Sequence, residues 1–209
     1  MTWTGSENAR QRAWALGDKR LRDKRAAGQP AGGFWDDIET ARALSHTIPF
    51  RERDEFKRGR TAEQLVAQWL TEQGWYVIPS YDYGGTNGDK APSLIGLLNS
   101  YAVPDLDISR AGVRRWVEVK LKAGADWTHI TQQFEHGIHY RLLEHYRNVE
   151  LITGSECWLA IYEENSSWLI GQSLAKLGDP RRSTMNGTPM AYWPQAAFRR
   201  LKQFNPPTD

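Results

Sequence analysis

Two short segments of alternating apolar and polar residues, 105–109 and 113–121, most constrain how this chain can fold. They are separated by three residues that end in Gly112, so the pattern predicts a β-hairpin. Successive side chains of a strand point to opposite faces. The second strand therefore has one apolar face, which we assign to the core, and an opposite face that carries Glu118 and Lys120.

The segment before this hairpin predicts a helix and a strand. Apolar residues recur at helical spacing between Ala62 and Leu70, and Gly74 suits the end of that helix. Residues 75–78 predict a short strand that ends at Pro79. A connection over 80–103 follows, and a connection of that length in a compact domain is usually functional or mobile.

The segments after the hairpin predict a second helix and a second hairpin. Apolar positions favour a helix over 129–147, and residues 157–162 and 167–170 read as two more strands. The Pro-containing tail is expected to be irregular, with a short helix over 196–202. Helices interleaved with strands of a mixed sheet predict an α/β fold.

The charge is unevenly distributed along the chain. Residues 1–30 and 181–209 each carry a net charge of +4, whereas residues 61–180 carry −6, although the whole chain is only +2. Basic arms around an acidic centre suit a polyanionic partner and a metal site. Solvated helix faces give the same pattern. The expected organisation is a helical basic N-terminal extension, a core and an irregular basic C-terminal tail, over 1–58, 59–177 and 178–209.

Several protein classes are excluded by composition. The single cysteine, Cys157, excludes an internal disulfide and a cysteine-rich zinc or iron–sulfur site. No apolar run approaches the roughly 18 residues that cross a bilayer, and residues 1–12 lack the apolar core of a signal peptide. We therefore expect a cytoplasmic protein with no membrane partner.

The predicted hairpin gathers acidic and basic side chains. Pairing of its strands brings Asp105 near Glu118, and Lys120 lies on the same face. Two neighbouring carboxylates are costly unless a charge compensates them, and Mg²⁺ prefers such oxygen ligands. With a lysine to act on water, this set suits phosphodiester hydrolysis. Asp107 is an alternative or additional metal ligand, and Lys122 extends the lysine face. An ordinary solvated hairpin face is the other interpretation.

These residues resemble a known motif. Pro104-Asp105, followed by Glu118-Val119-Lys120, resembles the motif of the PD-(D/E)xK nuclease superfamily. The order of the predicted elements is similar to its restriction-endonuclease-like αβββαβ core, a mixed sheet flanked by helices. The segment around Glu63, with Gly74-Trp75 after it, is similar to the opening of Holliday-junction-resolvase-like and phage-type members. The resemblance covers roughly residues 60–170.

The resemblance implies a metal-dependent deoxyribonuclease. Asp105 and Glu118 would hold Mg²⁺ or Mn²⁺ with the Val119 carbonyl, Glu63 would be a further ligand, and Lys120 would act on the attacking water. The branch it resembles suggests DNA that is branched or structured, in recombination, repair or phage genome processing. Members of this branch are often dimers, which leaves a homodimer open. No cofactor other than the metal is expected.

The predicted second helix places Gln133, His136 and Tyr140 on one face, at positions i, i+3 and i+7. In related nucleases this helix supplies a polar residue that supports the lysine or contacts DNA. We therefore expect Gln133 to act in catalysis, with His136 and Tyr140 as auxiliary residues.

Two other functions fit the same sequence. One is a nucleic-acid-binding or assembly protein that keeps the fold without catalysis, and the other is a sequence-specific restriction-type endonuclease. The chain is also rich in tryptophan, with ten copies, and we expect Trp69, Trp116 and Trp158 to serve in packing.

Overall fold

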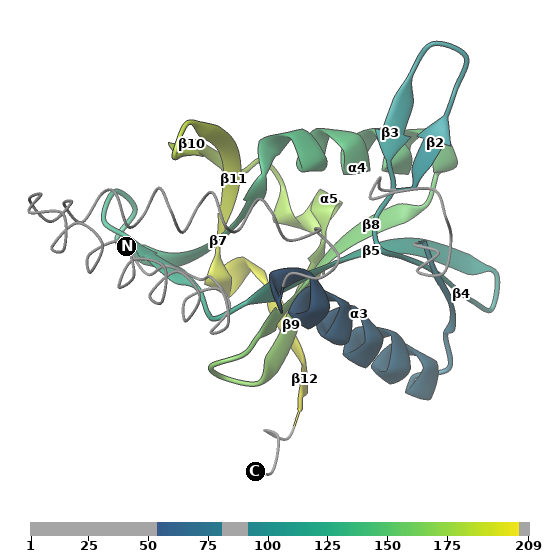
Figure 1. The fold of residues 1–209 in the computed structure, drawn as a ribbon, viewed down its shortest axis with the longest axis horizontal. Helices are drawn as coiled ribbons and strands as arrows, with labels where there is room; N and C mark the ends of the chain where they lie inside the picture. Colours follow the sequence, from purple (N-terminus) through teal and green to yellow (C-terminus); the bar gives the residue numbers. More distant parts are fainter. Residues whose placement is uncertain (1–53, 81–91, 205–209) are drawn as a thin grey trace, which may run out of the picture. The chain divides into compact units, whose positions relative to one another are not determined.

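The structure, a computed structural model, describes residues 54–80 and 92–204 (Figure 1). The chain divides into two compact units, 1–60 and 61–209, and the arrangement given below is that of the second unit. The helical extension predicted over 1–58 lies almost entirely outside the described residues. Among the helices that are described, none is long and apolar enough to cross a membrane.

The central element is a mixed six-stranded sheet in the order β1-β4-β5-β8-β9-β12. Strands β5 and β8 pair in parallel, and every other neighbouring pair in this sheet is antiparallel. The strands span Tyr76–Pro79 (β1), Leu106–Arg110 (β4), Val113–Lys122 (β5), Glu156–Glu163 (β8), Trp168–Ser173 (β9) and Arg199–Gln203 (β12).

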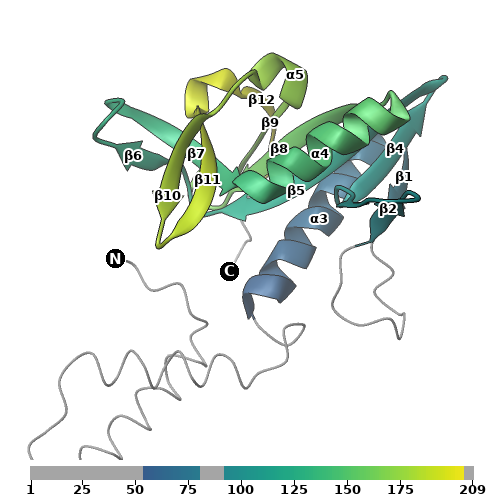
Figure 2. The same ribbon diagram turned by 90° about the horizontal axis from the view of Figure 1, so that it is seen from above.

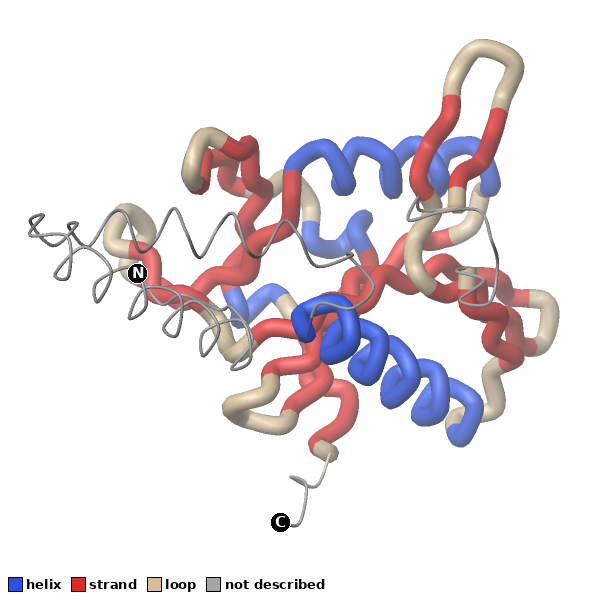
Figure 3. Tube along the Cα trace, viewed as in Figure 1, coloured by secondary structure: helices blue, strands red, loops and turns tan. Residues whose placement is uncertain are grey.

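A second sheet and a hairpin accompany the central sheet (Figure 3). The four-stranded sheet has the order β10-β11-β7-β6, and β2 and β3 form the separate hairpin. Their bounds are Ser93–Ile95 (β2), Ser100–Ala102 (β3), Asp126–Thr128 (β6), Gln133–His139 (β7), Arg181–Met185 (β10) and Thr188–Pro194 (β11). The helices of the described residues are α3 (Asp54–Glu72), α4 (Tyr140–Thr153), α5 (Leu174–Leu177) and the 3₁₀ turn η2 (Gln195–Ala197).

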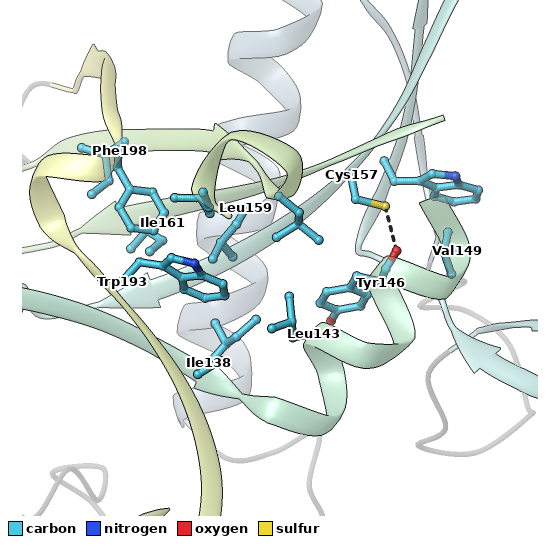
Figure 4. Close-up of a cluster of buried hydrophobic side chains, with 14 of the residues drawn as sticks. Ile138, Leu143, Tyr146, Val149, Cys157, Leu159, Ile161, Trp193 and Phe198 are labelled. Carbon is cyan, nitrogen blue, oxygen red and sulfur yellow. Dashed lines mark hydrogen bonds between the residues drawn. The ribbon is translucent and has the colours of Figure 1, made fainter. Parts of the chain in front are cut away.

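The central sheet is covered on both faces. On one face, Ala62, Val66 and Leu70 of α3 pack with Val117 and Val119 of β5. On the other face, α4 lies over the sheet, as Figure 2 shows from above. Figure 4 shows the core on that side, where the Cys157 thiol donates to the backbone carbonyl of Tyr146. Its buried side chains include Leu143, Val149, Leu159, Ile161 and Trp193.

The predicted fold class is confirmed. Without the β2–β3 hairpin and the small sheet, the elements up to β8 follow the order α3-β1-β4-β5-α4-β8, which is the expected αβββαβ order, and β9, α5, η2 and β12 come after it. The helix ends where predicted, because Gly74 has φ +81°, a left-handed conformation that glycine adopts without strain. The hairpin of β4 and β5 is also confirmed, with Leu106 opposite Val117.

The helix predicted over 129–147 is wrong in its first half. Residues 133–139 form strand β7, and α4 begins only at Tyr140. The strand is favoured because β11 pairs with it, and Gly137 lets the Tyr192 ring lie directly against its backbone. A short apolar run fits either period, so a partner distant in sequence decided the outcome.

Described parts of two segments for which no strand was predicted form strands. In the tail, the described residues 178–204 form β10, β11, η2 and β12, and the helix predicted over 196–202 is replaced by η2 and a strand. The connection over 80–103 contains the β2–β3 hairpin. Two of these strands pair with elements far away in the chain, β11 with β7 and β12 with β9, which local composition does not reveal.

We predict that α4 stabilises the fold through one face only. Leu143→Ala should lower the free energy of unfolding by about 2–5 kcal/mol, because Leu143 is fully buried and its loss leaves a cavity. Leu151→Ala, on the same helix at 81% exposure, is the matched control and should change little. Urea unfolding measures both, and equal losses would contradict the packing described.

Candidate active site

Asp105 is held in place by backbone contacts at the start of β4. Its carbonyl accepts a hydrogen bond from the Ser80 N–H at 2.8 Å, and its carboxylate Oδ2 accepts one from the Val119 N–H, also at 2.8 Å. Val119 lies beyond the last ladder pair of β4 and β5, Leu106 with Val117. The Asp105 carboxylate therefore accepts a hydrogen bond from a β5 backbone N–H that has no ladder partner in β4.

Glu118 is a buried acid in the middle of β5, with only 2% of its surface exposed. Its Oε1 forms an ion pair with the Lys120 ammonium, which lies two residues along the same face. Its Oε2 is buried and has no hydrogen-bond partner among the described residues. Burying such an oxygen without a partner is costly, so a further ligand that binds it would lower this cost.

The charges around Asp105 oppose its ionisation. Burial raises the pKa of Asp105 well above its usual value, and the carboxylates of Glu118 and Glu63 raise it further. The Lys120 ammonium and the Val119 N–H act in the opposite direction and lower this pKa. The structure therefore brings Asp105, Glu118, Lys120 and the α3 residue Glu63 within electrostatic reach of one another. A bound cation would offset the electrostatic repulsion between these carboxylates.

Asp107, the alternative ligand, has another partner. Both of its carboxylate oxygens accept hydrogen bonds from Arg114, at 2.9 Å and 2.7 Å. This bidentate pair lies at the surface, opposite Trp116 in the ladder. Asp105, rather than Asp107, therefore has the position beside Glu118.

Lys122 lies two residues beyond Lys120 and is half-buried. Burial lowers its pKa, the Lys120 charge lowers it further, and Asp126 partly offsets both effects. Lys122 is the ladder partner of Glu163 in β8, so the lysine face of β5 ends beside a second buried acid.

Gln133, His136 and Tyr140 do not share a helix face, which corrects the sequence-based expectation. Gln133 and His136 belong to β7 of the four-stranded sheet, whereas Asp105 and Glu118 lie in or next to the six-stranded one. Tyr140 starts α4, and its ring stacks under Arg182 at 4.4 Å. The error follows from the strand that replaces the first half of the predicted helix.

A buried polar network around Glu163 escaped the sequence analysis. Its carboxylate contacts His136 Nε2 at 2.8 Å and Ser166 Oγ at 2.9 Å, and it also accepts a hydrogen bond from Gln195. A carboxylate only accepts, so a neutral His136 would carry its proton on Nε2. An acid that directly follows the apolar strand 157–162 was the available signal.

The donor set fits a hard divalent cation. Within residues 54–80 and 92–204, no group of three or more His, Cys, Asp or Glu side chains is arranged to hold a metal. Two carboxylates are present, however, and one carries the unpartnered Glu118 Oε2. Cations such as Mg²⁺ complete their shell with backbone carbonyls and water. Asp105 and Glu118 can thus supply the anionic part of a metal site.

Comparisons with known proteins are sparse. No protein-family model matches the chain, and no curated protein matches it. Among solved structures, it is similar to Hjc, a Holliday junction resolvase from the archaeal hyperthermophile Archaeoglobus fulgidus, with a TM-score of 0.43 and 12% sequence identity. That alignment covers 66% of this chain and 90% of the resolvase. The assignment of a function therefore depends on the residues of this chain.

We predict that divalent cations stabilise the fold through Glu118. Mg²⁺ or Mn²⁺ should raise the melting temperature of the wild type, because a ligand of the folded state adds about 2.7 kcal/mol at 100 times its Kd. Glu118→Gln should lose this shift, since it replaces the carboxylate that carries the unpartnered oxygen with a neutral amide. Asp107→Asn, the matched control, should keep it because Asp107 pairs with Arg114. Equal shifts in all three proteins would contradict the assignment.

We predict a pH-dependent stability from His136. Burial lowers its pKa below the ordinary value, and this outweighs the opposite effect of Glu163. A lowered pKa means that the full stability is present above about pH 6.5 and is lost as the pH falls, by at most about 1.4 kcal/mol per pH unit.

Urea unfolding between pH 7 and pH 5 measures this loss. His136→Gln keeps a donor for Glu163 but cannot titrate, so its unfolding free energy should fall less steeply than that of the wild type. His129→Gln changes an exposed histidine and is the control. Parallel curves for wild type and His136→Gln would refute the prediction.

Proposed function

We propose that this protein is a metal-dependent nuclease that hydrolyses DNA phosphodiester bonds at Asp105, Glu118 and Lys120. The observation that carries the proposal is the unpartnered, buried Oε2 of Glu118 beside the second carboxylate of Asp105. A purely structural pair of acids would be expected to have its oxygens satisfied. An acid pair with an unpartnered oxygen and an ion-paired lysine is suited to binding a cation and hydrolysing a phosphodiester bond.

Each residue has a distinct role in this proposal. Asp105 and Glu118 hold Mg²⁺ or Mn²⁺ with the Val119 carbonyl, and Glu63 adds negative charge from α3. When bound, such a cation polarises the phosphate and makes water more acidic. The Val119 N–H keeps the Asp105 carboxylate in its orientation. Lys120, anchored by Glu118, orients the attacking water and neutralises charge that develops on the phosphate.

The proposed substrate is branched or structured DNA, in keeping with the resolvase-like motif around Glu63. The basic terminal segments of the sequence would hold its phosphates, since 1–30 and 181–209 each carry a net charge of +4. Gln133 and Tyr140 have no catalytic role in this proposal, because the first lies in the second sheet and the second stacks under Arg182.

We predict metal-dependent cleavage that requires Lys120 and Glu118. Lys120→Ala and Glu118→Ala should each lower the rate by at least about 100-fold, the usual scale for loss of a positioned acid–base group. Lys176→Ala, an exposed lysine on α5, is the control and should cleave normally. The assay offers four-way junctions, single strands and plasmid DNA with Mg²⁺ or Mn²⁺.

The substrate panel also separates the alternatives. Preferred cutting of junctions supports the branched-DNA proposal, whereas defined fragments from plasmid DNA would indicate a restriction-type enzyme. Binding without cutting under every metal would favour a non-catalytic assembly protein. Cleavage that both substitutions leave intact would refute the site.

A further inference from the structure

Arginine and tryptophan side chains alternate across one end of the six-stranded sheet. Arg110 lies 4.5 Å from the Trp75 ring, and Arg115 lies 5.3 Å from both Trp75 and Trp158. Arg199 also lies 5.3 Å from the Trp158 ring. We call these five residues the Arg–Trp row. They come from β4, the turn before β1, β5, β8 and β12, so the row crosses most of the sheet.

A hollow of about 140 Å³ adjoins this row. Three indoles line it, those of Trp69, Trp75 and Trp158, together with Arg115 and aliphatic side chains such as Val117. Protein cores leave few voids larger than a water molecule. A row of rings that served packing alone would be expected to close over this space.

The row presents positive charge around the hollow. Arg110 and Arg199 are exposed, and Arg115 is half-buried and paired with Glu156 at 2.8 Å. Guanidinium groups match phosphate oxygens in planar, bidentate geometry. Indole faces, by contrast, stack on the flat face of any nucleobase, whatever the sequence. The two together call for a ligand that carries both phosphates and an aromatic ring.

The volume of the hollow limits the size of the ligand that it can hold. Pockets that enclose a drug-sized ligand or cofactor measure about 300 Å³ or more, so this hollow accommodates one ring system and not a dinucleotide. We propose that the Arg–Trp row is a binding site for single-stranded nucleic acid. One unstacked base enters the hollow between the indoles, and Arg110 and Arg199 contact the neighbouring phosphates.

This site is distinct from the candidate active site and goes beyond the proposed nuclease function. Arg115 and Val117 point to the face of β5 that α3 covers, whereas Glu118 and Lys120 point to the opposite face. Arg115 is also five residues from Lys120, about 17 Å along the strand. Binding in the hollow therefore needs neither the metal nor Glu118.

The test measures binding of full-length protein in EDTA, where metal-dependent cleavage cannot occur. The probes are a fluorescent single-stranded oligothymidylate, an abasic strand of equal length and, as a competitor, polyglutamate. We expect the oligothymidylate to bind about tenfold more tightly than the abasic strand, the scale of one stacked base. We expect polyglutamate to compete poorly. Glu118→Gln should keep this preference even if it abolishes cleavage.

Two variants are designed to exclude the base from the hollow. A third removes a phosphate contact, and a fourth is its control. Ala160→Val fills the hollow that Ala160 lines, and Trp69→Leu removes one ring, so each should abolish the tenfold preference. Arg199→Gln should weaken both strands equally. Its neighbour Arg200 stacks on Trp168 at 5.0 Å, outside the row, so Arg200→Gln is the matched control and should have the smaller effect. Near-ultraviolet circular dichroism verifies the fold of each variant.

The results decide the proposal in either direction. Loss of the preference in folded Ala160→Val or Trp69→Leu supports it. Equal affinity of the wild type for the two strands overturns it without recourse to any variant. Polyglutamate that competes as well as the oligothymidylate would assign the surface to an acidic peptide and overturn it too.

Discussion

The middle of strand β5, from Trp116 to Val119, is buried on both of its faces, and the rest of the structure depends on this. It pairs with β4 on one edge and β8 on the other, and its two faces lie against the two hydrophobic cores. Polar groups on this part of the strand therefore have to find partners inside the protein. The Asp105 carboxylate does this for the Val119 N–H, and the Lys120 ammonium does it for one oxygen of Glu118. The positions of the two acids consequently depend on the β4–β5 hairpin and on the cores that pack against it.

The buried carboxylates of the described part of the chain fall into two groups. Glu163 and Glu135 are each bound by three side chains; those around Glu135 are Thr128, Thr131 and Arg181, and they hold its pKa below the usual value. Asp105 and Glu118 differ, because burial and mutual repulsion raise the pKa of one and leave an oxygen of the other unpartnered. A structure tolerates such a cost mainly where a site needs it. Satisfaction of hydrogen bonds, rather than burial alone, thus distinguishes the candidate active site from acids that stabilise the fold.

The parts that the sequence predicted correctly depend on neighbours in the chain. The α3 helix ends at Gly74 because glycine suits a left-handed turn, and the β4–β5 hairpin follows from alternation around Gly112. Strand β7 was mistaken for a helix because its pairing partner, β11, lies some fifty residues further along. The same limit explains the C-terminal strands, whose composition suggested an irregular tail. Only the α3-facing side of β5 was recognised as core, although both sides are buried.

The sequence by itself determined the α/β class, the hairpin and the proximity of Asp105, Glu118 and Lys120, because strand alternation and a short turn place these residues with no distant partner. Only the tertiary structure decided that Asp107 pairs with Arg114, that His136 contacts Glu163, and that Trp158, which was expected to pack, forms a row with Trp75 and arginines. Each of the last two arrangements joins strands separated by long stretches of chain. No local period encodes which of many polar or aromatic side chains will meet there, so packing of the whole domain selects the partners.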